Sequence, residues 1–219
     1  MKRIYASIKS NPLFDGVTED EFGQMFSCLS ARTIRYNKDD MILLAGSAID
    51  SVGLIISGSV SVLKEDSNGN VSLLTELSKS DIFGEVFACA GVSKSPVTIQ
   101  AIENTEVFFV GFRKIITTCT STCPFHSRLV ENMLKLIAQK TLLLNQKIEL
   151  LSQRTTRDKL LSFFEMYSGG EKQFSIPFNR EGLARYLCVD RSAMSNELCK
   201  MRDEGLIRFN KNYFEILSS

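Results

Sequence analysis

The sequence of 219 residues has one histidine, four prolines and no tryptophan. The scarcity of histidine removes many of the metal and acid–base sites on which enzymes depend. No apolar run approaches the roughly 20 residues of a membrane-spanning helix, so no membrane partner is expected. An excess of one charge is also lacking, since 26 basic residues stand against 25 acidic ones. Any surface that attracts nucleic acid must therefore be local.

The six cysteines include no CxxC pair. The N-terminus, MKRIYASIKSNPLF, lacks the apolar segment of a secretory signal. We therefore expect reduced thiols in a cytoplasmic protein and no metal site. Cys119 and Cys123 lie four residues apart and could share a helix face. That spacing leaves a disulfide switch open, beside the simpler interpretation of two small residues near a helix start.

Short segments rich in Val, Ile, Leu, Phe and Thr lie between residues 31 and 112, separated by Gly or Asn. The stretch SVSVLKEDSNGNVSLLTEL predicts a β-hairpin, because Asn68-Gly69 suits the positive φ of a tight turn. Many short strands with frequent turns are typical of a closed or rolled antiparallel structure. Short helices are expected before them, one with Thr18 as its N-cap. The first domain is predicted to span residues 1–123.

From residue 124 the apolar period becomes helical, and neither Gly nor Pro interrupts residues 125–153. Apolar spacings of four and three alternate here, which is typical of a coiled-coil seam of about three heptads. The sequence therefore predicts a dimerisation helix over 124–151 and a homodimer, and a helix packed only on its own domain is the alternative. The predicted interface residues are Val130, Leu134, Ile137, Thr141, Leu144, Ile148 and Leu151.

The remaining residues, 152–219, are predicted to form a small separate unit. A helix over 152–168 comes first, and its expected buried residues are Leu160, Leu161, Phe163 and Phe164. Two helices separated by the turn Cys188-Val189-Asp190 follow, and then a hairpin at IRFNKNYFEI. A helix, a short turn and a second helix form the motif that places its second helix in the major groove of DNA.

The second of these helices has a small, polar first turn on its outer face, which groove entry requires. Arg191 can donate two parallel hydrogen bonds to guanine, Asn196 matches the adenine edge, and Ser192 and Ser195 can serve either base. The hairpin is predicted to be a wing, with Lys211 at its tip available to phosphate. Arg180 is the other expected phosphate contact. An ordinary exposed helix in a small α domain is the alternative.

Two stretches are similar to motifs of the Crp/Fnr superfamily of bacterial transcription regulators. SDIFGEVF at 80–87 resembles its GDxFGE turn, and NREGLARYLCVDRSAMSNELCKMRDEGLI resembles its helix-turn-helix block. The resemblance covers nearly the whole chain and implies an α+β fold. In this fold an N-terminal antiparallel β-roll of the cyclic-nucleotide-binding type acts as the sensory domain, and a long dimerisation helix and a C-terminal winged helix-turn-helix follow. It also implies double-stranded DNA with an inverted-repeat operator as the partner, and RNA polymerase as a second partner of an activator.

The sequence departs from the family at the effector pocket. Cyclic-nucleotide binders of the family hold the phosphate with Arg-Ser-Ala, whereas this sequence has Ser95-Pro96-Val97, with Lys94 one place early. Lysine cannot reproduce the bidentate fork of arginine, so cyclic AMP is not the expected effector. Another small molecule, or a vestigial pocket, stays open. The pocket residues that the resemblance implies are Gly84, Glu85, Lys94, Ser95, Pro96, Thr141, Leu144 and Asn145.

Other chemistries of the family lack their residues here. An iron–sulfur cluster needs about four thiolates, and no cysteine precedes Cys28. Haem would depend on His126 or a cysteine as axial ligand, and no cofactor is expected. Since no facial triad, Gly-rich phosphate loop, GxSxG or HExxH occurs, no enzyme is expected. A ligand-binding or redox-sensing module that acts on a partner protein is the alternative to a DNA-binding regulator.

Overall fold

The computed structural model describes residues 2–117, 123 and 125–217 and contains two compact units, residues 1–138 and residues 139–219. The long helix α5 (Phe125–Ser152) contributes its first half to one unit and its second half to the other. Within the described ranges, no helix has both the length and the apolar character needed to cross a membrane.

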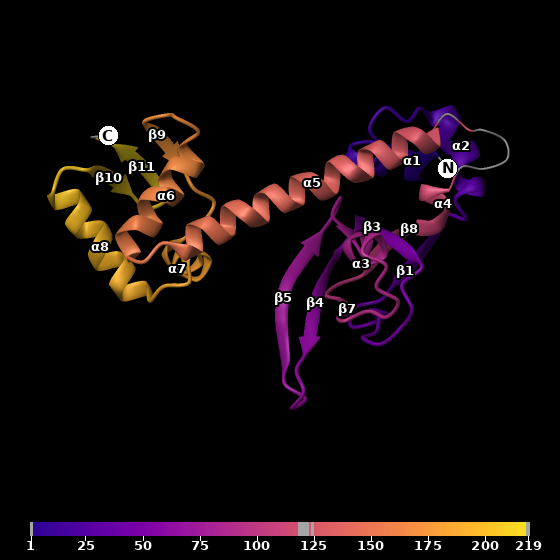
Figure 1. Ribbon diagram of the computed structural model, residues 1–219, viewed down its shortest axis with the longest axis horizontal. Coiled ribbons are helices and arrows are strands. Elements are labelled where there is room, and N and C mark those ends of the chain that lie inside the picture. Colours follow the sequence, from indigo (N-terminus) through magenta and orange to yellow (C-terminus); the bar gives the residue numbers. More distant parts are fainter. Residues whose placement is uncertain (1, 118–122, 124, 218–219) are drawn as a thin grey trace. The chain divides into compact units, whose positions relative to one another are not determined.

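The first unit contains two antiparallel sheets of four strands each. The first sheet has the order β1 (Arg32–Tyr36), β8 (Thr105–Gly111), β3 (Ser51–Ser57) and β6 (Ile82–Phe83). The second sheet has the order β2 (Met41–Leu43), β7 (Thr98–Ala101), β4 (Ser59–Glu65) and β5 (Val71–Ser78). The predicted hairpin is confirmed as β4 and β5, which extend as a long ribbon in Figure 1. Its turn contains Gly69 at a φ of 83°.

Strand β8 is buried on both faces, and its side chains alternate between two cores. Val107 and Phe109 pack with Ile55 of the neighbouring strand β3 in the interior of the roll. Phe108 and Val110 point the other way, into a core that the helices cover. Since successive side chains of a strand point to opposite faces, one strand joins both layers of this unit.

Short helices cover the outer face of the first sheet, and they are α1 (Lys2–Ile8), the 3-10 turn η1 (Pro12–Phe14) and α2 (Glu19–Cys28). Two more, α3 (Glu85–Cys89) and α4 (Phe112–Ile116), lie further along the chain. Thr18 caps α2 as predicted, because its hydroxyl accepts from the Glu21 N–H at 3.3 Å and the Glu21 carboxylate accepts from the Thr18 N–H at 2.9 Å. Phe125, Leu129, Met133 and Leu136 of α5 are buried in the same core.

The second unit combines helices with a small sheet. Its elements are α6 (Thr156–Ser168), β9 (Gln173–Ser175), α7 (Arg180–Leu187), α8 (Arg191–Asp203), β10 (Ile207–Asn210) and β11 (Tyr213–Ile216). The strands pair in the order β10-β11-β9. Leu160, Phe163 and Phe164 are buried as predicted, but the prediction for Leu161 was wrong, since it lies on the outer side of α6 and is 44% exposed. The α+β architecture inferred from the sequence is confirmed.

Candidate DNA-binding surface and sensory hollow

The turn between α7 and α8 is tight and well capped. Cys188 adopts a left-handed conformation at a φ of 51°, and the Val189 N–H donates to the Ala184 carbonyl at 3.1 Å. Asp190 is the N-cap of α8, and its carboxylate accepts from the Ala193 N–H at 2.8 Å and from the Ser192 hydroxyl at 2.5 Å. The Ser192 hydroxyl and the Ala193 N–H lower the pKa of the Asp190 carboxyl. The start of α8 is therefore held in a defined geometry.

The residues predicted to read bases lie together on the first two turns of α8. Arg191, Ser192 and Asn196 are exposed and Ser195 is half-buried. The Ser195 hydroxyl donates to the Arg191 carbonyl at 2.8 Å, so both serines make local hydrogen bonds. Lys211 is exposed in the two-residue turn of the β10–β11 hairpin, at a φ of 52°. These positions match a groove-reading helix beside a wing.

Half of the ten cations from residue 155 to residue 219 are paired with acids of this unit. Arg185 pairs with Glu181, Arg202 with Asp203, and Arg208 with Glu215. By contrast, the Arg191 guanidinium and the Lys211 ammonium make no ion pair with any residue that the structure describes. Although residues 155–219 include ten basic and nine acidic residues, Arg191 and Lys211 thus keep their charge unpaired at the predicted DNA side.

Arg180 differs from the other predicted DNA contacts. Its guanidinium lies over the rings of Phe209 and Phe214, with distances of 4.7 and 5.1 Å to the ring centroids. Burial lowers its pKa. Arg180 therefore joins the start of α7 to the wing through cation–π contacts, and its role as a phosphate contact stays a prediction.

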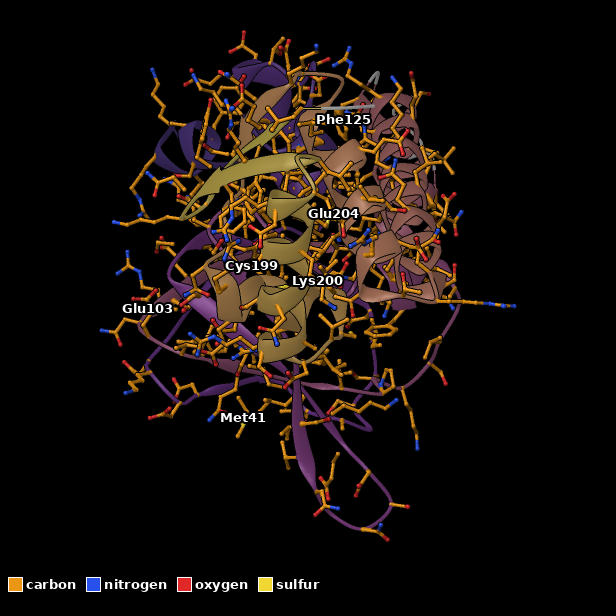
Figure 2. All side chains as sticks on the ribbon, turned by 90° about the vertical axis from the view of Figure 1, so that its left-hand side faces the viewer. Met41, Glu103, Phe125, Cys199, Lys200 and Glu204 are labelled. Atoms are coloured by element: carbon orange, nitrogen blue, oxygen red, sulfur yellow. The ribbon has the colours of Figure 1, made fainter. Side chains whose placement is uncertain are left out.

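Three long cations that the sequence patterns did not single out hold α8 and α7 in place. Arg157 of α6 donates to Glu197 at 2.5 Å and forks onto Glu204 at 2.7 Å. Figure 2 shows Glu204 at the end of α8, together with Cys199 and Lys200 of that helix. Lys147 donates to the Tyr186 carbonyl, and Lys159 donates to the Leu187 carbonyl at 3.3 Å. Cations at the C-terminal carbonyls of α7 are favourable, because that end of a helix is electronegative.

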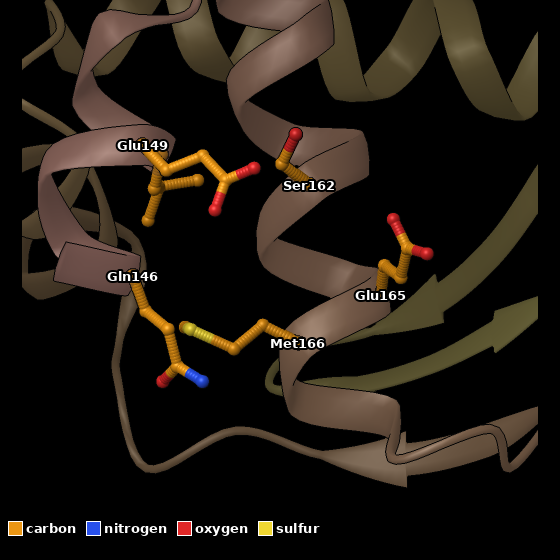
Figure 3. Close-up of a pocket in the computed structure, with 6 residues that line it drawn as sticks. Gln146, Glu149, Ser162, Glu165 and Met166 are labelled. Atoms are coloured by element: carbon orange, nitrogen blue, oxygen red, sulfur yellow. The ribbon is translucent and has the colours of Figure 1, made fainter. Parts of the chain in front are cut away.

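A hollow of about 350 Å³ lies between the end of α5 and α6. Figure 3 shows Gln146 and Glu149 on one side of it and Ser162, Glu165 and Met166 on the other. The two carboxylates disfavour phosphate. This side of the unit is therefore an unsuitable face for DNA, in contrast to the start of α8.

The β-roll encloses a second hollow of about 270 Å³, between its two sheets. Tyr36, Phe83 and Phe109 line it with aromatic surface, and Arg32 lies at its edge with its guanidinium 5.3 Å from the centre of the Phe109 ring. Gly53 leaves the space that the Phe83 ring occupies. The hollow thus combines aromatic and aliphatic side chains with one cation, Arg32, and one carboxylate, Asp50, which the sequence analysis did not single out.

The pocket residues implied by the resemblance differ in burial, and only Gly84 of them is among the residues that line the hollow of the roll. Gly84 lines the hollow of the roll and has a φ of 83°. Glu85 is buried at the start of α3, and Ser95 is buried with its hydroxyl donating to the Val97 carbonyl at 2.6 Å. Lys94 and Pro96 are exposed. Thr141, Leu144 and Asn145 are exposed on the half of α5 that belongs to the second unit, so their role in a pocket stays a prediction.

The predicted seam of α5 is largely open to solvent in the single chain. Leu134, Leu144 and Ile148 are 67%, 62% and 64% exposed. Thr141 is exposed as well, and the half-buried members of the seam are Val130, Ile137 and Leu151. Large apolar side chains in a row along one helix are costly to leave in water, which is typical of a surface that another chain covers.

The cysteines fall into two groups. Cys89, Cys188 and Cys199 are exposed, whereas Cys28 and Cys123 are half-buried. Cys119 lies outside the described residues, so the hypothesis of a Cys119–Cys123 disulfide stays a prediction.

Two family models match successive parts of the chain. The model described as a cyclic nucleotide-binding domain matches residues 33–121, and the model described as a Crp-like helix-turn-helix domain matches residues 135–218. The first contains the β-roll strands from β2 to β8, and the second contains the helix-turn-helix and the wing. The order of the two matches is the order of the two units.

Similar proteins span nearly the whole chain. The Cyclic AMP receptor protein of Thermus thermophilus is 23% identical over 213 residues, which cover 95% of this chain and 94% of the relative. The crystal structure of the Thermus thermophilus catabolite activator protein matches at a TM-score of 0.54 and 20% identity, over 94% of this chain and 93% of the other. The c-di-GMP-responsive global regulator CLP of Xanthomonas campestris matches at a TM-score of 0.56 and 17% identity, over 94% and 100%.

Proposed function

Because this chain belongs to the Crp/Fnr superfamily of transcription regulators, we propose that it acts as a homodimer that binds an inverted-repeat operator in double-stranded DNA. Two copies related by a two-fold axis present two copies of α8, and each copy reads one half-site. The half-sites are then expected one helical turn apart.

The observation that carries this proposal is the unpaired charge at the start of α8. Arg191 is exposed there beside the small side chains of Ser192 and Asn196, and the cap at Asp190 fixes their direction. The nearby Arg202 is paired with Asp203 of the same unit. The net charge of the protein is almost zero, so a few unpaired cations are expected to supply its attraction to DNA. A fork of two donors suits guanine, which makes Arg191 the proposed base reader.

The exposed apolar row on α5 supports the dimer. A second copy that covers Leu134, Leu144 and Ile148 removes these side chains from water. An effector would act by shifting the population between dimer geometries that fit the operator spacing and geometries that do not.

We further propose that the effector is not cyclic AMP, although one relative is named a Cyclic AMP receptor protein. The Ser95 hydroxyl donates its hydrogen bond to the Val97 carbonyl, and Pro96 has no N–H to donate to a phosphate. Lys94 is exposed and offers a point charge in place of a bidentate fork.

Selection of bound duplexes from a random DNA pool by the purified full chain, without added ligand, tests the proposed function. The expected result is enrichment of an inverted repeat whose half-sites are one helical turn apart. The Arg191→Ala variant, put through the same selection, is expected to lose preference at one position of each half-site. If neither the protein alone nor the protein with cell extract enriches any sequence, the chain does not act as a DNA-binding regulator.

A further inference from the structure

Three side chains with soft or borderline ligand atoms meet in the first unit, away from the hollow of the roll. Cys28 is the last residue of α2, Cys123 precedes α5, and His126 lies in the first turn of α5. One ligand atom from each lies within 4.8 Å of the other two. The Cys28 Sγ and the His126 Nε2 are 3.2 Å apart.

The protein holds this cluster in a fixed and largely dry place. His126 is 2% exposed, and its ring stacks on Phe125 with the ring centroids 4.7 Å apart. The backbone N–H of His126 donates to the Cys123 carbonyl at 3.2 Å, which joins two of the three residues through the main chain. Both cysteines pack against the core that contains Phe125 and Leu129.

One feature of the imidazole points to a ligand. Its Nδ1 is buried and has no hydrogen-bond partner among the residues that the structure describes, while its Nε2 faces a thiol, which is a weak donor and acceptor. The Nε2, which lies 3.2 Å from the Cys28 Sγ, is the nitrogen that can bind an ion together with the two thiolates, and such an ion would leave the proton of the neutral ring on Nδ1.

We propose that Cys28, Cys123 and His126 bind a zinc-type divalent transition-metal ion. Thiolate and imidazole are the ligands that zinc prefers, whereas Mg²⁺ and Ca²⁺ require oxygen ligands, which this set does not supply. Bonds of about 2.3 Å to sulfur and about 2.0 Å to nitrogen place tetrahedral ligand atoms about 3.5–3.8 Å apart. One separation in the cluster is 3.2 Å and the others do not exceed 4.8 Å, so a modest adjustment of the side chains is expected to bring the three atoms onto one ion.

Three protein ligands leave a fourth coordination position for water or another small ligand. His126 also lines a hollow of about 320 Å³ with Ile115, Ile116 and Ser127, which is open space beside one of the proposed ligands. Metal binding requires deprotonated thiols and therefore releases protons, so the affinity falls as the pH is lowered.

The ion would fasten the end of α2 to the start of α5, the long helix that continues into the second unit. Occupancy of the site is then expected to change how readily the dimer binds its operator. This consequence rests on the proposed function, whereas metal binding itself does not. A metal ion would thus be the effector, or one of two effectors, of this regulator.

Cobalt(II) tests the site, because it replaces zinc and absorbs visible light. The full chain is reduced, stripped with a chelator and titrated with Co²⁺ without oxygen. The expected result is one equivalent per chain, with thiolate-to-cobalt charge transfer, the visible bands of a tetrahedral ion, and displacement by Zn²⁺. Absence of the charge-transfer band from the folded wild-type chain overturns the proposal.

Single substitutions show which residues bind the ion. Cys28→Ser, Cys123→Ser and His126→Ala are each expected to weaken Co²⁺ binding at least 10–100-fold, about the range seen when only an outer-shell partner of a metal ligand is lost. Cys199→Ser, which changes an exposed thiol on α8, is the matched control and is expected to bind as the wild type does. Circular dichroism identifies any variant that fails to fold, and the two serine variants change only one atom each. The assignment is wrong if Cys199→Ser loses as much Co²⁺ affinity as the other variants do. It is also wrong if folded Cys28→Ser and Cys123→Ser bind Co²⁺ as the wild type does.

Operator affinity measured with and without Zn²⁺ tests the regulatory consequence separately from metal binding itself. A zinc-dependent change in operator affinity that Cys28→Ser abolishes supports the regulatory consequence. An unchanged affinity overturns that consequence but leaves the metal site standing. A chain that binds Co²⁺ but selects no DNA sequence in any condition overturns the proposed function instead.

Discussion

At the scale of single residues, Arg191 and Lys211 are expected to contribute to DNA binding in different ways. Arg191 lies on the first turn of α8, where a side chain reaches base edges. Lys211 lies in the turn of the wing, where the backbone of a bound duplex is expected to pass. A base contact changes which sequence is bound, whereas a phosphate contact strengthens binding to every sequence.

Arg191→Ala is expected to cost about 1–3 kcal/mol of discrimination at one guanine, because two parallel hydrogen bonds to that base are lost. Lys211→Asn is the matched comparison, since asparagine tolerates the positive φ of this position and only the charge disappears. It is expected to weaken binding evenly and to lower the salt slope by about 1. Fluorescence anisotropy with a panel of operators measures both. An even loss across the panel for Arg191→Ala would contradict its role as base reader.

Glu106 shows how one buried carboxylate can make stability depend on pH. Arg3 donates to it at 2.7 Å and Arg35 at 3.1 Å, and the Arg3 hydrogen bond, followed by that of Arg35, lowers the pKa of the carboxyl despite burial. The stabilisation is fully present above the ordinary pKa of 4.5 and is lost as the pH falls through the lowered value in the folded state.

Glu106→Gln is therefore expected to lower the free energy of unfolding by about 1–2 kcal/mol at neutral pH, since both arginines are largely exposed and their contribution is screened. Urea unfolding of the full chain measures this difference, which is expected to shrink in acid. A difference that stays constant down to acid pH would show that packing, not charge, accounts for the loss.

At the scale of elements, the cap of α8 controls the geometry of the reading surface. Asp190→Ala removes the acceptor of the Ala193 N–H and of the Ser192 hydroxyl. The variant is expected to melt several degrees lower and to bind DNA more weakly, because the first turn of α8 frays. Asp190→Asn keeps the cap and is expected to retain both properties. Differential scanning calorimetry and anisotropy test the pair, and equal damage in both variants would point to the charge instead of the cap.

Helix α5 allows a second test at this scale. Leu144 lies on the predicted seam and Leu142 lies off it, yet both are 62% exposed in the single chain. Leu144→Glu is expected to yield monomers of 24.6 kDa by light scattering, because a charge at the seam must be buried without a partner. Leu142→Glu is the control and is expected to stay dimeric. A dimeric mass for Leu144→Glu places the interface elsewhere.

At the scale of the whole molecule, binding of an effector to the folded protein raises its melting temperature. A ligand at a hundred times its dissociation constant stabilises a protein by about 2.7 kcal/mol, which raises the melting temperature by several degrees in a chain of this size. Cyclic AMP is expected to leave the melting temperature unchanged, because Ser95 and Pro96 replace the arginine fork of the family's binders. A clear shift in differential scanning fluorimetry would overturn that interpretation of the pocket.

Much of the architecture was predictable because its signals are local. Asn68-Gly69 between two alternating segments predicted the β4–β5 hairpin, Thr18 as an N-cap predicted the start of α2, and the helix-turn-helix block predicted α7 and α8. Positions on the first turn of α8 were predictable for the same reason, since a cap and a helical period fix which side chains share a face. Leu161 was misplaced, because a wide apolar stripe does not by itself define the buried side of α6.

The sequence by itself determined the order and type of the elements, the apolar face of α5 and the residues on the outer face of α8, because periodicity, capping and turn chemistry act over a few neighbouring residues. Only the tertiary structure decided which distant side chains meet. It brought Cys28 to His126, placed Arg157 between α6 and α8, and turned Arg180 onto the rings of the wing. Such contacts depend on how whole elements pack against a common core, and a local pattern does not encode that arrangement.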